Sequence, residues 1–314
     1  MKKLSIISPI LNEEKNIENL FNGLKKERDK LNKLYDVNFV FVDDGSTDNS
    51  KKVLDKLSLE NNFLNVITFT KNFGHQNAVL AGLSEQDSDL YLVLDADLQH
   101  DTKLISQMLE SMNKFNCEIV HMKRKYTNYE NYFKRLLSKA FYSIFGKLTG
   151  ISIPKGSADF FLIKKRVRDE IINSKISHSF IRGFLHWSGF SKIHIEYEQG
   201  RRISGVSKYT FMKQLEFALS GIYNYSNRLP VYIFILSSVI LIFSFIYLLF
   251  ILYEYFFLGV PTSGWASTVI LILFFGSISI LFNSIILFIL FKIFNFSGKK
   301  PNYIKKDSRN KNHE

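Results

Sequence analysis

The 314-residue chain contains only one cysteine, Cys117. A single thiol cannot form an intramolecular disulfide, so the fold does not depend on an oxidising compartment. This agrees with a cytosolic location for the folded part of the chain. We expect Cys117 to be a small core residue.

Several motifs of common chemistry are missing as well. The seven histidines form no His-Glu-x-x-His pair and no cluster with cysteine, which argues against a zinc site. There is no Gly-x-Ser-x-Gly nucleophile elbow, no phosphate loop and no dinucleotide fingerprint. His75 and His100 lie beside motifs described below, where local hydrogen bonding explains them as well as catalysis does.

The net charge of +12 is not accompanied by a nucleic-acid recognition motif. Nucleic acid is therefore not an expected partner. The basic balance instead indicates attraction to anionic lipid and to phosphate-bearing ligands.

Charge is absent from two long stretches near the carboxyl end. No charged residue lies in residues 229–253 or in residues 259–291. About 20 helical residues span a hydrocarbon layer of roughly 30 Å, and soluble core helices rarely run so long without a charge. We predict two transmembrane helices, at about 230–253 and 265–291, rather than a buried helical hairpin in a soluble protein.

The charges that flank these stretches predict the orientation. The connector 254–264 holds no Lys or Arg, whereas seven basic residues lie from Lys292 to the end of the chain. Basic segments stay on the cytosolic side. We therefore expect a multi-pass protein of the inner (cell) membrane, a two-helix hairpin over 229–294, and a basic, disordered tail over 295–314. Both termini and the domain before the hairpin would be cytosolic.

Residues 1–228 alternate short β-rich runs with amphipathic, lysine-rich helical patterns. This alternation predicts one α/β domain with a mostly parallel sheet covered on both faces. The expected strands are 4–9, 37–42, 64–69, 89–94 and 117–122, and the expected helices are about 13–33, 48–60, 75–85 and 101–115. Two basic amphipathic segments, 131–150 and 211–230, are expected to be helical. The first lies either at the membrane interface or against the sheet as an ordinary helix, and the second is expected at the interface.

Two aspartates, Asp95 and Asp97, follow the fourth expected strand in the segment LVLDADLQH. In an extended chain the two side chains are held apart, so both can bind one ion only if the strand ends there in a turn. Carboxylate oxygens suit Mg²⁺ or Mn²⁺, which also bind substrate phosphates. A solvated acidic turn is the alternative, and the pair alone is a weak signal.

Three further polar segments follow strand ends: SPILNEE (8–14), VDDGS (42–46) and KNFGHQNAVLAGL (71–83). Ligands of open α/β sheets bind at these carboxyl ends. With all four motifs in this order, the chain resembles inverting nucleotide-sugar glycosyltransferases of the GT-A fold, a Rossmann-like, mostly parallel α/β fold. It is most similar to the polyprenyl-phosphate glycosyltransferases, which include dolichol-phosphate mannose synthase and bactoprenol glucosyltransferases with two carboxy-terminal membrane helices.

The resemblance implies a site for a nucleoside-diphosphate sugar with Mg²⁺ or Mn²⁺. The residues implied to bind the donor are Pro9, Leu11, Glu13, Val42, Asp43, Asp44, Asp95, Ala96 and Gln99. The residues implied to hold the metal are Asp95, Asp97 and Gln99. The residues implied to bind the acceptor phosphate are Arg124, Arg135 and Ser138, and those implied to be catalytic are Asp159, Arg202 and Lys208. Three residues depart from the family pattern: Leu11 replaces an aromatic, Phe161 an arginine and Val206 a polar residue.

The resemblance predicts transfer of one sugar to a polyprenyl phosphate, undecaprenyl phosphate being the expected one, for surface glycan or lipid modification. A lipid monophosphate has a second pKa near ~6 and is largely ionised at neutral pH, so Asp159 either orients a substrate or acts as a base. One alternative is transfer to a polysaccharide or glycolipid hydroxyl. Another is a non-catalytic partner of a membrane flippase or polymerase, favoured only if Phe161 and Val206 mark a decayed site. Association of identical chains is left open.

Overall fold

The computed structural model describes residues 1–125, 146–150, 152–154, 156–174, 180–198, 200, 229–259, 264–297, 303, 305 and 306. The chain divides into two compact units. The first unit comprises Met1–Asn224 with Pro301–Glu314, and the second comprises Tyr225–Lys300.

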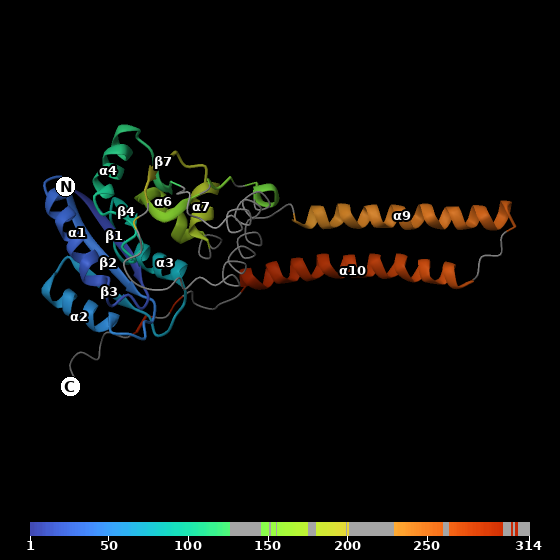
Figure 1. The fold of residues 1–314 in the computed structure, drawn as a ribbon, viewed down its shortest axis with the longest axis horizontal. Helices are drawn as coiled ribbons and strands as arrows, with labels where there is room; N and C mark the ends of the chain where they lie inside the picture. The colour runs from blue at the N-terminus through green and yellow to red at the C-terminus, as the bar shows by residue number, and fades with distance from the viewer. Residues whose placement is uncertain are drawn as a thin grey trace. The chain divides into compact units, whose positions relative to one another are not determined.

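The first unit is built on a seven-stranded sheet in the order β3-β2-β1-β4-β6-β5-β7 (Figure 1). The strands are β1 (Lys2–Ile10), β2 (Tyr35–Asp43), β3 (Leu64–Thr68), β4 (Leu90–Val93), β5 (Ile119–Arg124), β6 (Ser157–Lys164) and β7 (Lys192–Tyr197). Strand β6 is antiparallel to both of its neighbours, and all other pairs are parallel. The predicted mostly parallel α/β sheet is confirmed. Strands β6 and β7 were not predicted.

Helices cover both faces of the sheet. They are α1 (Ile17–Leu31), α2 (Ser50–Glu60), α3 (His75–Glu85), α4 (Leu104–Lys114), α6 (Lys165–Asn173) and α7 (Ile181–Trp187). Alternate residues of a strand point to opposite faces. Leu4 and Ile6 accordingly join the core formed with α1 and α4, whereas Ile7 lies against Gly82 of α3 on the other face.

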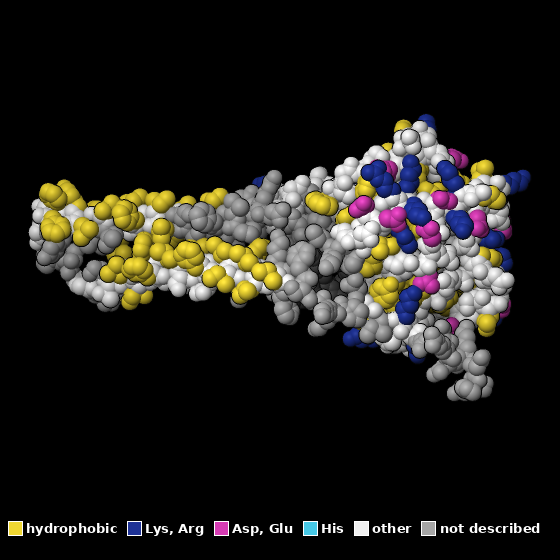
Figure 2. Space-filling view, turned by 180° about the vertical axis from the view of Figure 1, so that it is seen from behind, with side chains coloured by type: hydrophobic (Ala, Val, Ile, Leu, Met, Phe, Trp, Pro, Cys, Tyr) yellow, Lys and Arg dark blue, Asp and Glu magenta, His cyan; other side chains and the backbone are white. Residues whose placement is uncertain are grey.

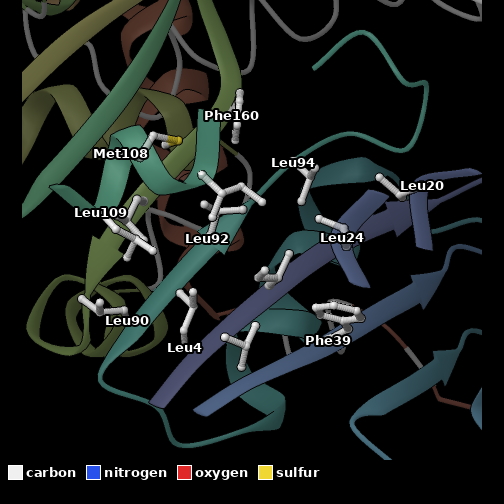
Figure 3. Close-up of a cluster of buried hydrophobic side chains, with 14 of the residues drawn as sticks. Leu4, Leu20, Leu24, Phe39, Leu90, Leu92, Leu94, Met108, Leu109 and Phe160 are labelled. Carbon is white, nitrogen blue, oxygen red and sulfur yellow. The ribbon is translucent and has the colours of Figure 1, made fainter. Parts of the chain in front are cut away.

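The main core lies between the sheet and helices α1 and α4 (Figure 3). Leu4, Phe39 and Leu92 from three adjacent strands are fully buried there. Burying one such side chain stabilises the fold by about 1.5–3 kcal/mol, and this core fixes the strands whose carboxyl ends carry the polar motifs. Cys117 is buried in the same core, as predicted.

The second unit consists of two long helices that pack against each other, α9 (Leu229–Phe257) and α10 (Gly264–Ser297). Hydrophobic side chains lie along their described surfaces, whereas the described face of the first unit carries Lys, Arg, Asp and Glu (Figure 2). Among the described residues, one segment, Ile270–Leu290 in α10, is long and apolar enough to cross a membrane. The apolar segment of α9, Val239–Glu254, is shorter, so the second predicted membrane helix is not confirmed.

Two predictions near the membrane segments meet different outcomes. Of the two predicted interfacial segments, only residues 146–150, 229 and 230 are described, and residues 146–149 are helical. The tail was predicted to be disordered, and this is wrong for Tyr303, Lys305 and Lys306, which contact β3 and residues beside it. The edge strand of a sheet has unpaired backbone N–H and C=O groups, and hydrogen bonds to these groups stabilise an ordered tail.

Candidate active site

The first part of the site lies at the carboxyl ends of β1 and β2. Pro9 and Val42 are paired in register, and the Asp44 N–H donates to the Ile10 carbonyl at 2.8 Å. Asp43 and Asp44 are almost fully buried, at 1% and 2% exposure. The parallel register therefore brings the ends of the first two motifs together.

Hydrogen bonds join the loops that follow these two strands. The Thr47 N–H donates to Asn12 Oδ1 at 2.7 Å, and the Asn12 N–H donates to Ser46 Oγ at 2.9 Å. The Glu13 N–H donates to Ser50 Oγ at 2.9 Å. Leu11 and Glu13, both implied to bind the donor, thus lie in a loop cross-linked to the second motif.

Asp44 holds the third motif in place. Its Oδ1 accepts the Phe73 N–H at 2.7 Å, and its Oδ2 accepts the Gly74 N–H at 3.0 Å. Burial raises the pKa of Asp44, and these two backbone donors partly offset that rise. The Asp44 carboxylate therefore holds the loop that precedes α3.

Gly45 allows the second and third motifs to approach closely. Its φ is +69°, and a Cβ built on it would lie 2.4 Å from the Lys71 carbonyl carbon. Only glycine combines this left-handed backbone with so close a neighbour. The glycine of VDDGS is thus required by the contact with KNFG.

The aspartate pair of the fourth motif lies in a turn. Strand β4 ends at Val93, two residues before Asp95. Leu98 has a φ of +60°, and the Gln99 N–H donates to Asp97 Oδ1 at 3.2 Å. The chain therefore turns between Asp95 and Gln99. Such a turn is the condition under which both carboxylates can bind one ion.

Asp95 and Asp159 lie opposite each other because β4 and β6 are antiparallel. Val93 pairs with Phe161 in the last pair of this ladder, and Asp95 and Asp159 each lie two residues beyond that pair. His75 Nε2 lies 3.6 Å from Asp95 Oδ1 and 3.7 Å from Asp159 Oδ2. The first residue of α3 thus lies beside both carboxylates.

Arg182 of α7 binds Asp159 through two nitrogens. Its Nη2 lies 2.6 Å from Asp159 Oδ2, and its Nε donates to Oδ1 at 3.0 Å. The helix is placed by a further bond, in which the Ile181 N–H donates to Gln76 Oε1 at 2.9 Å. A bidentate guanidinium–carboxylate pair fixes both distance and orientation.

The two central carboxylates are ionised. Burial opposes ionisation of Asp159, but the charges of Arg182 and His75 outweigh it and hold the pKa of Asp159 well below its usual range. Burial likewise opposes ionisation of Asp95, but His100 and His75 lower its pKa. At neutral pH both groups are anions.

His100 is supported from behind. Its Nε2 lies 3.5 Å from Asp95 Oδ2, and its Nδ1 is hydrogen-bonded to the Tyr197 hydroxyl at 2.9 Å. The His100 ring also packs on Phe160, with ring centres 4.8 Å apart. Tyr197 at the end of β7 thus fixes the imidazole beside Asp95.

The structure brings together only some of the residues implied by the resemblance. Pro9, Val42, Asp43 and Asp44 lie together at the ends of β1 and β2, and Asp95 lies beside Asp159. Arg124 ends β5, paired in register with Tyr197. Ala96 is buried in the turn after Asp95. Arg135, Ser138, Arg202 and Lys208 lie outside the described residues.

Sequence reasoning missed Arg182 and Tyr197 and left His75 and His100 unassigned. His75 had a usable signal, since it lies in a motif at a strand end. Arg182 had none, because its place depends on β6, which was not predicted, and on a helix 22 residues after Asp159 in the chain.

Among the described residues, no three His, Cys, Asp or Glu side chains have the arrangement of a preformed metal site. Mg²⁺ and Mn²⁺ can bind through one or two carboxylates when substrate phosphates complete the shell. Asp95 and Asp97, two oxygen ligands in one turn, fit this mode.

Comparison with known proteins identifies the family. Residues 5–172 match the family described as Glycosyl transferase family 2. An uncharacterized glycosyltransferase of Bacillus subtilis, YkcC, is 33% identical over 97% of this chain and 93% of its own length. The bactoprenol glucosyl transferase of Shigella phage SfV is 28% identical over 98% of this chain and 100% of its own length.

A solved structure shares the fold. Mannosyl-3-phosphoglycerate synthase from Rubrobacter xylanophilus superposes with a TM-score of 0.51, covering 71% of this chain and 72% of that one, at 13% identity. At this identity the likeness concerns the fold, which agrees with the predicted GT-A architecture. From the family match and the full-length relatives together, the chain belongs to glycosyl transferase family 2.

Proposed function

We propose that the protein transfers one sugar from a nucleoside-diphosphate sugar to a polyprenyl phosphate, with inversion at the anomeric carbon. The observation that carries this is the convergence of Asp95 and Asp159 beside the strand ends that hold Asp43 and Asp44. A relative that matches 98% of this chain is a bactoprenol glucosyl transferase, which supports a polyprenyl acceptor.

The donor would lie across the carboxyl ends of the sheet. Pro9, Val42 and Asp43 would line the nucleoside subsite, together with the cross-linked loop that carries Leu11 and Glu13. The backbone amides and carboxylates of these loops are already ordered by hydrogen bonds. Binding of a base and a ribose would therefore cost little conformational entropy. The nucleotide base and the sugar are left open.

The leaving diphosphate would lie over the turn of the fourth motif. Asp95, Asp97 and Gln99 would hold Mg²⁺ or Mn²⁺, which when bound neutralises charge on the departing diphosphate. The pKa of Asp95 is lowered by His100 and His75, which lie 3.5 and 3.6 Å from its carboxylate, so Asp95 would offer an anionic oxygen to the cation. Ala96, which lies between the two acids, is buried in the main core and would contribute its backbone to the donor site.

The acceptor phosphate would attack without help from a base. One of its oxygens forms a bond to the anomeric carbon, and the bond from that carbon to the diphosphate breaks, with its electron pair leaving on the diphosphate. A lipid monophosphate is already ionised at neutral pH. Asp159, with its pKa lowered by Arg182, is a weak base, which favours an orienting role in the sugar subsite.

The hairpin of α9 and α10 would bring this site to the membrane surface. The sequence holds no charge over residues 229–253, and α9 is helical over that whole range, which supports a second membrane span beside Ile270–Leu290. The positively charged tail supports cytosolic termini. Arg124, Arg135, Ser138, Arg202 and Lys208 would then supply cations and a hydroxyl for donor and acceptor phosphates.

Transfer of labelled sugar in membranes tests the role of the aspartate turn. Asp97→Ala should reduce transfer to lipid phosphate by at least about 10²-fold, the scale of losing a preorganised electrostatic group. Asp101→Ala is the matched control, because Asp101 is an exposed acid four residues farther on. Equal transfer by Asp97→Ala and the control would refute the metal and diphosphate assignment.

A further inference from the structure

The carboxyl-terminal tail is bound to the edge of the sheet. Strand β3 is the outermost strand on its side, and the Lys306 N–H donates to the Thr68 carbonyl at 2.7 Å. Lys305 forms an antiparallel bridge with Phe69, directly after β3. The Lys305 Nζ lies 2.5 Å from Glu85 Oε2 at the end of α3. Backbone and side chain together specify one register for the tail.

Tyr303 adds an aromatic contact to this docking. Its ring stacks on Phe69, with ring centres 5.0 Å apart and planes within 15°. Phe69 is 2% exposed, so the tyrosine packs against a core residue. The tail therefore packs an aromatic ring on Phe69 in addition to its backbone hydrogen bond with the edge of the sheet.

A short series of contacts leads from Tyr303 to Asp44. Phe69 packs edge-on against Phe73, with ring centres 5.6 Å apart, and the Phe73 N–H donates to Asp44 Oδ1 at 2.7 Å. The Phe69 N–H donates to the Asp43 carbonyl at 2.9 Å. Phe69 thus connects the tail to both aspartates of the second motif.

We propose that the tail is a positioning element of the nucleotide site, in which Tyr303 supports Phe69 and Phe73 and so holds Asp44 and its loop. This rests on the proposed function, which assigns the loop to the nucleoside. Tyr303 follows α10 in the chain by six residues. The nucleotide site therefore depends on a segment that the chain supplies only after the whole hairpin.

The loop from Phe69 to Gly74 is well placed to transmit this support. Gly45 contacts it closely at Lys71, and Asp44 binds its last two amides. Phe69, its first residue, meets Tyr303. Packed groups of this kind respond together when one contact is removed.

Two pairs of variants of the full-length protein in detergent test the proposal. Tyr303→Ala removes the ring, and Tyr303→Phe keeps it. Lys306→Pro removes the N–H that binds Thr68, and Lys306→Ala keeps it. Aromatic pairs contribute about 0.5–1.5 kcal/mol, which is about a two- to tenfold change in an equilibrium constant. We expect the affinity for nucleotide to fall by that factor in Tyr303→Ala and Lys306→Pro. It should not change in Tyr303→Phe or Lys306→Ala.

Two readouts separate this proposal from the proposed function. The first is amide hydrogen exchange at Phe73 and Gly74 without nucleotide, which should be faster in Tyr303→Ala and Lys306→Pro. The second is binding of UDP and GDP by calorimetry, which should weaken about two- to tenfold in the same variants, with KM for the donor raised and kcat nearly unchanged. Unchanged exchange at both amides overturns the positioning role. Wild-type protein that binds neither nucleotide is then titrated with CDP, ADP and dTDP. Binding of none of the five overturns the proposed function, while the exchange comparison still decides the coupling.

Discussion

Arg182 binds both carboxylate oxygens of Asp159, and this pair determines what the aspartate can do. A carboxylate held in the ionised form gains little by accepting a proton, so it orients substrates better than it abstracts protons. The chemistry matches a phosphate acceptor, which brings no proton that must be removed. A hydroxyl acceptor would need a stronger base.

Replacing Arg182 by Gln should reduce transfer by roughly 10²-fold, because a misplaced catalytic group commonly costs that much. Without Arg182, burial raises the pKa of Asp159, so the rate should also fall on the acid side of the pH profile. Measuring kcat/KM between pH 5 and 8 checks both effects. Arg166→Gln, at an exposed arginine, is the control. A profile for Arg182→Gln that has the wild-type shape would contradict the role given to the pair.

Gly45→Ala should destabilise the protein more than Gly189→Ala does. Both glycines have a positive φ, +69° and +72°, which costs an alanine about 1–2 kcal/mol. Only Gly45 has a neighbour, at 2.4 Å from the added Cβ, and overpacking costs typically about 1–3 kcal/mol more. Thermal unfolding of the two variants measures the difference. Equal losses would mean that the close approach to Lys71 is unimportant.

Single residues were predictable where a motif follows a strand. Asp43, Asp44, Asp95 and Asp97 each stand at the end of an apolar run, and apolar runs are visible in a sequence. Arg182 could not be found this way, because its contact with Asp159 arises only after β6 and α7 have packed.

Three histidines from three elements lie together behind the site. His121 of β5 pairs in register with His194 of β7, and its ring centre lies 5.0 Å from that of His186 in α7. Burial, then the neighbouring histidine and arginine charges, lowers the pKa of His121 well below its usual value. Burial and Lys192 lower the pKa of His186 to about 3. Both are neutral in the folded protein at neutral pH.

Because of these histidines, the protein should be less stable to unfolding in mild acid. Below about pH 6.5 the unfolded chain takes up protons at these histidines and the folded chain does not, so the free energy of unfolding falls as pH falls. For His121 and His186 together we expect a loss of about 3 kcal/mol between pH 7.5 and 5.5, measured by urea unfolding. In His121→Leu/His186→Leu this slope should flatten. An unchanged slope in that variant would show that the acid sensitivity lies elsewhere.

Elements were predictable where periodicity is strong. The five predicted strands and four predicted helices of the amino-terminal half are present, with ends shifted by a few residues. Strand β6 was not predicted. The antiparallel direction of β6 depends on its place between β4 and β5 in the sheet, which no local sequence pattern encodes.

The chain joins a seven-stranded α/β sheet to two long apolar helices, and its tail contacts the edge of the sheet. Two long uncharged runs predicted the hairpin helices, although within the described part of the chain only Ile270–Leu290 is long and apolar enough to span a membrane. The return of the tail could not be predicted. Contacts made by three residues leave no periodic pattern in a basic segment.

Cysteine labelling can establish the topology of the hairpin. Cys117 is buried, so background labelling should be low. In whole cells, a membrane-impermeant maleimide should label Ser263→Cys in the connector and should reach Asn310→Cys in the tail only after permeabilisation. The reverse pattern, or labelling of both before permeabilisation, would contradict two membrane spans with cytosolic termini.

The central claim concerns the acceptor, and one measurement addresses it directly. The purified full-length protein is incubated with a panel of nucleotide sugars, a divalent cation, and either undecaprenyl phosphate or undecaprenol, and the lipids are analysed by mass spectrometry. We expect one donor to give undecaprenyl phosphate carrying a single added sugar, and no product from undecaprenol. Sugar on undecaprenol, or no product from undecaprenyl phosphate with any donor, would contradict a phosphate acceptor.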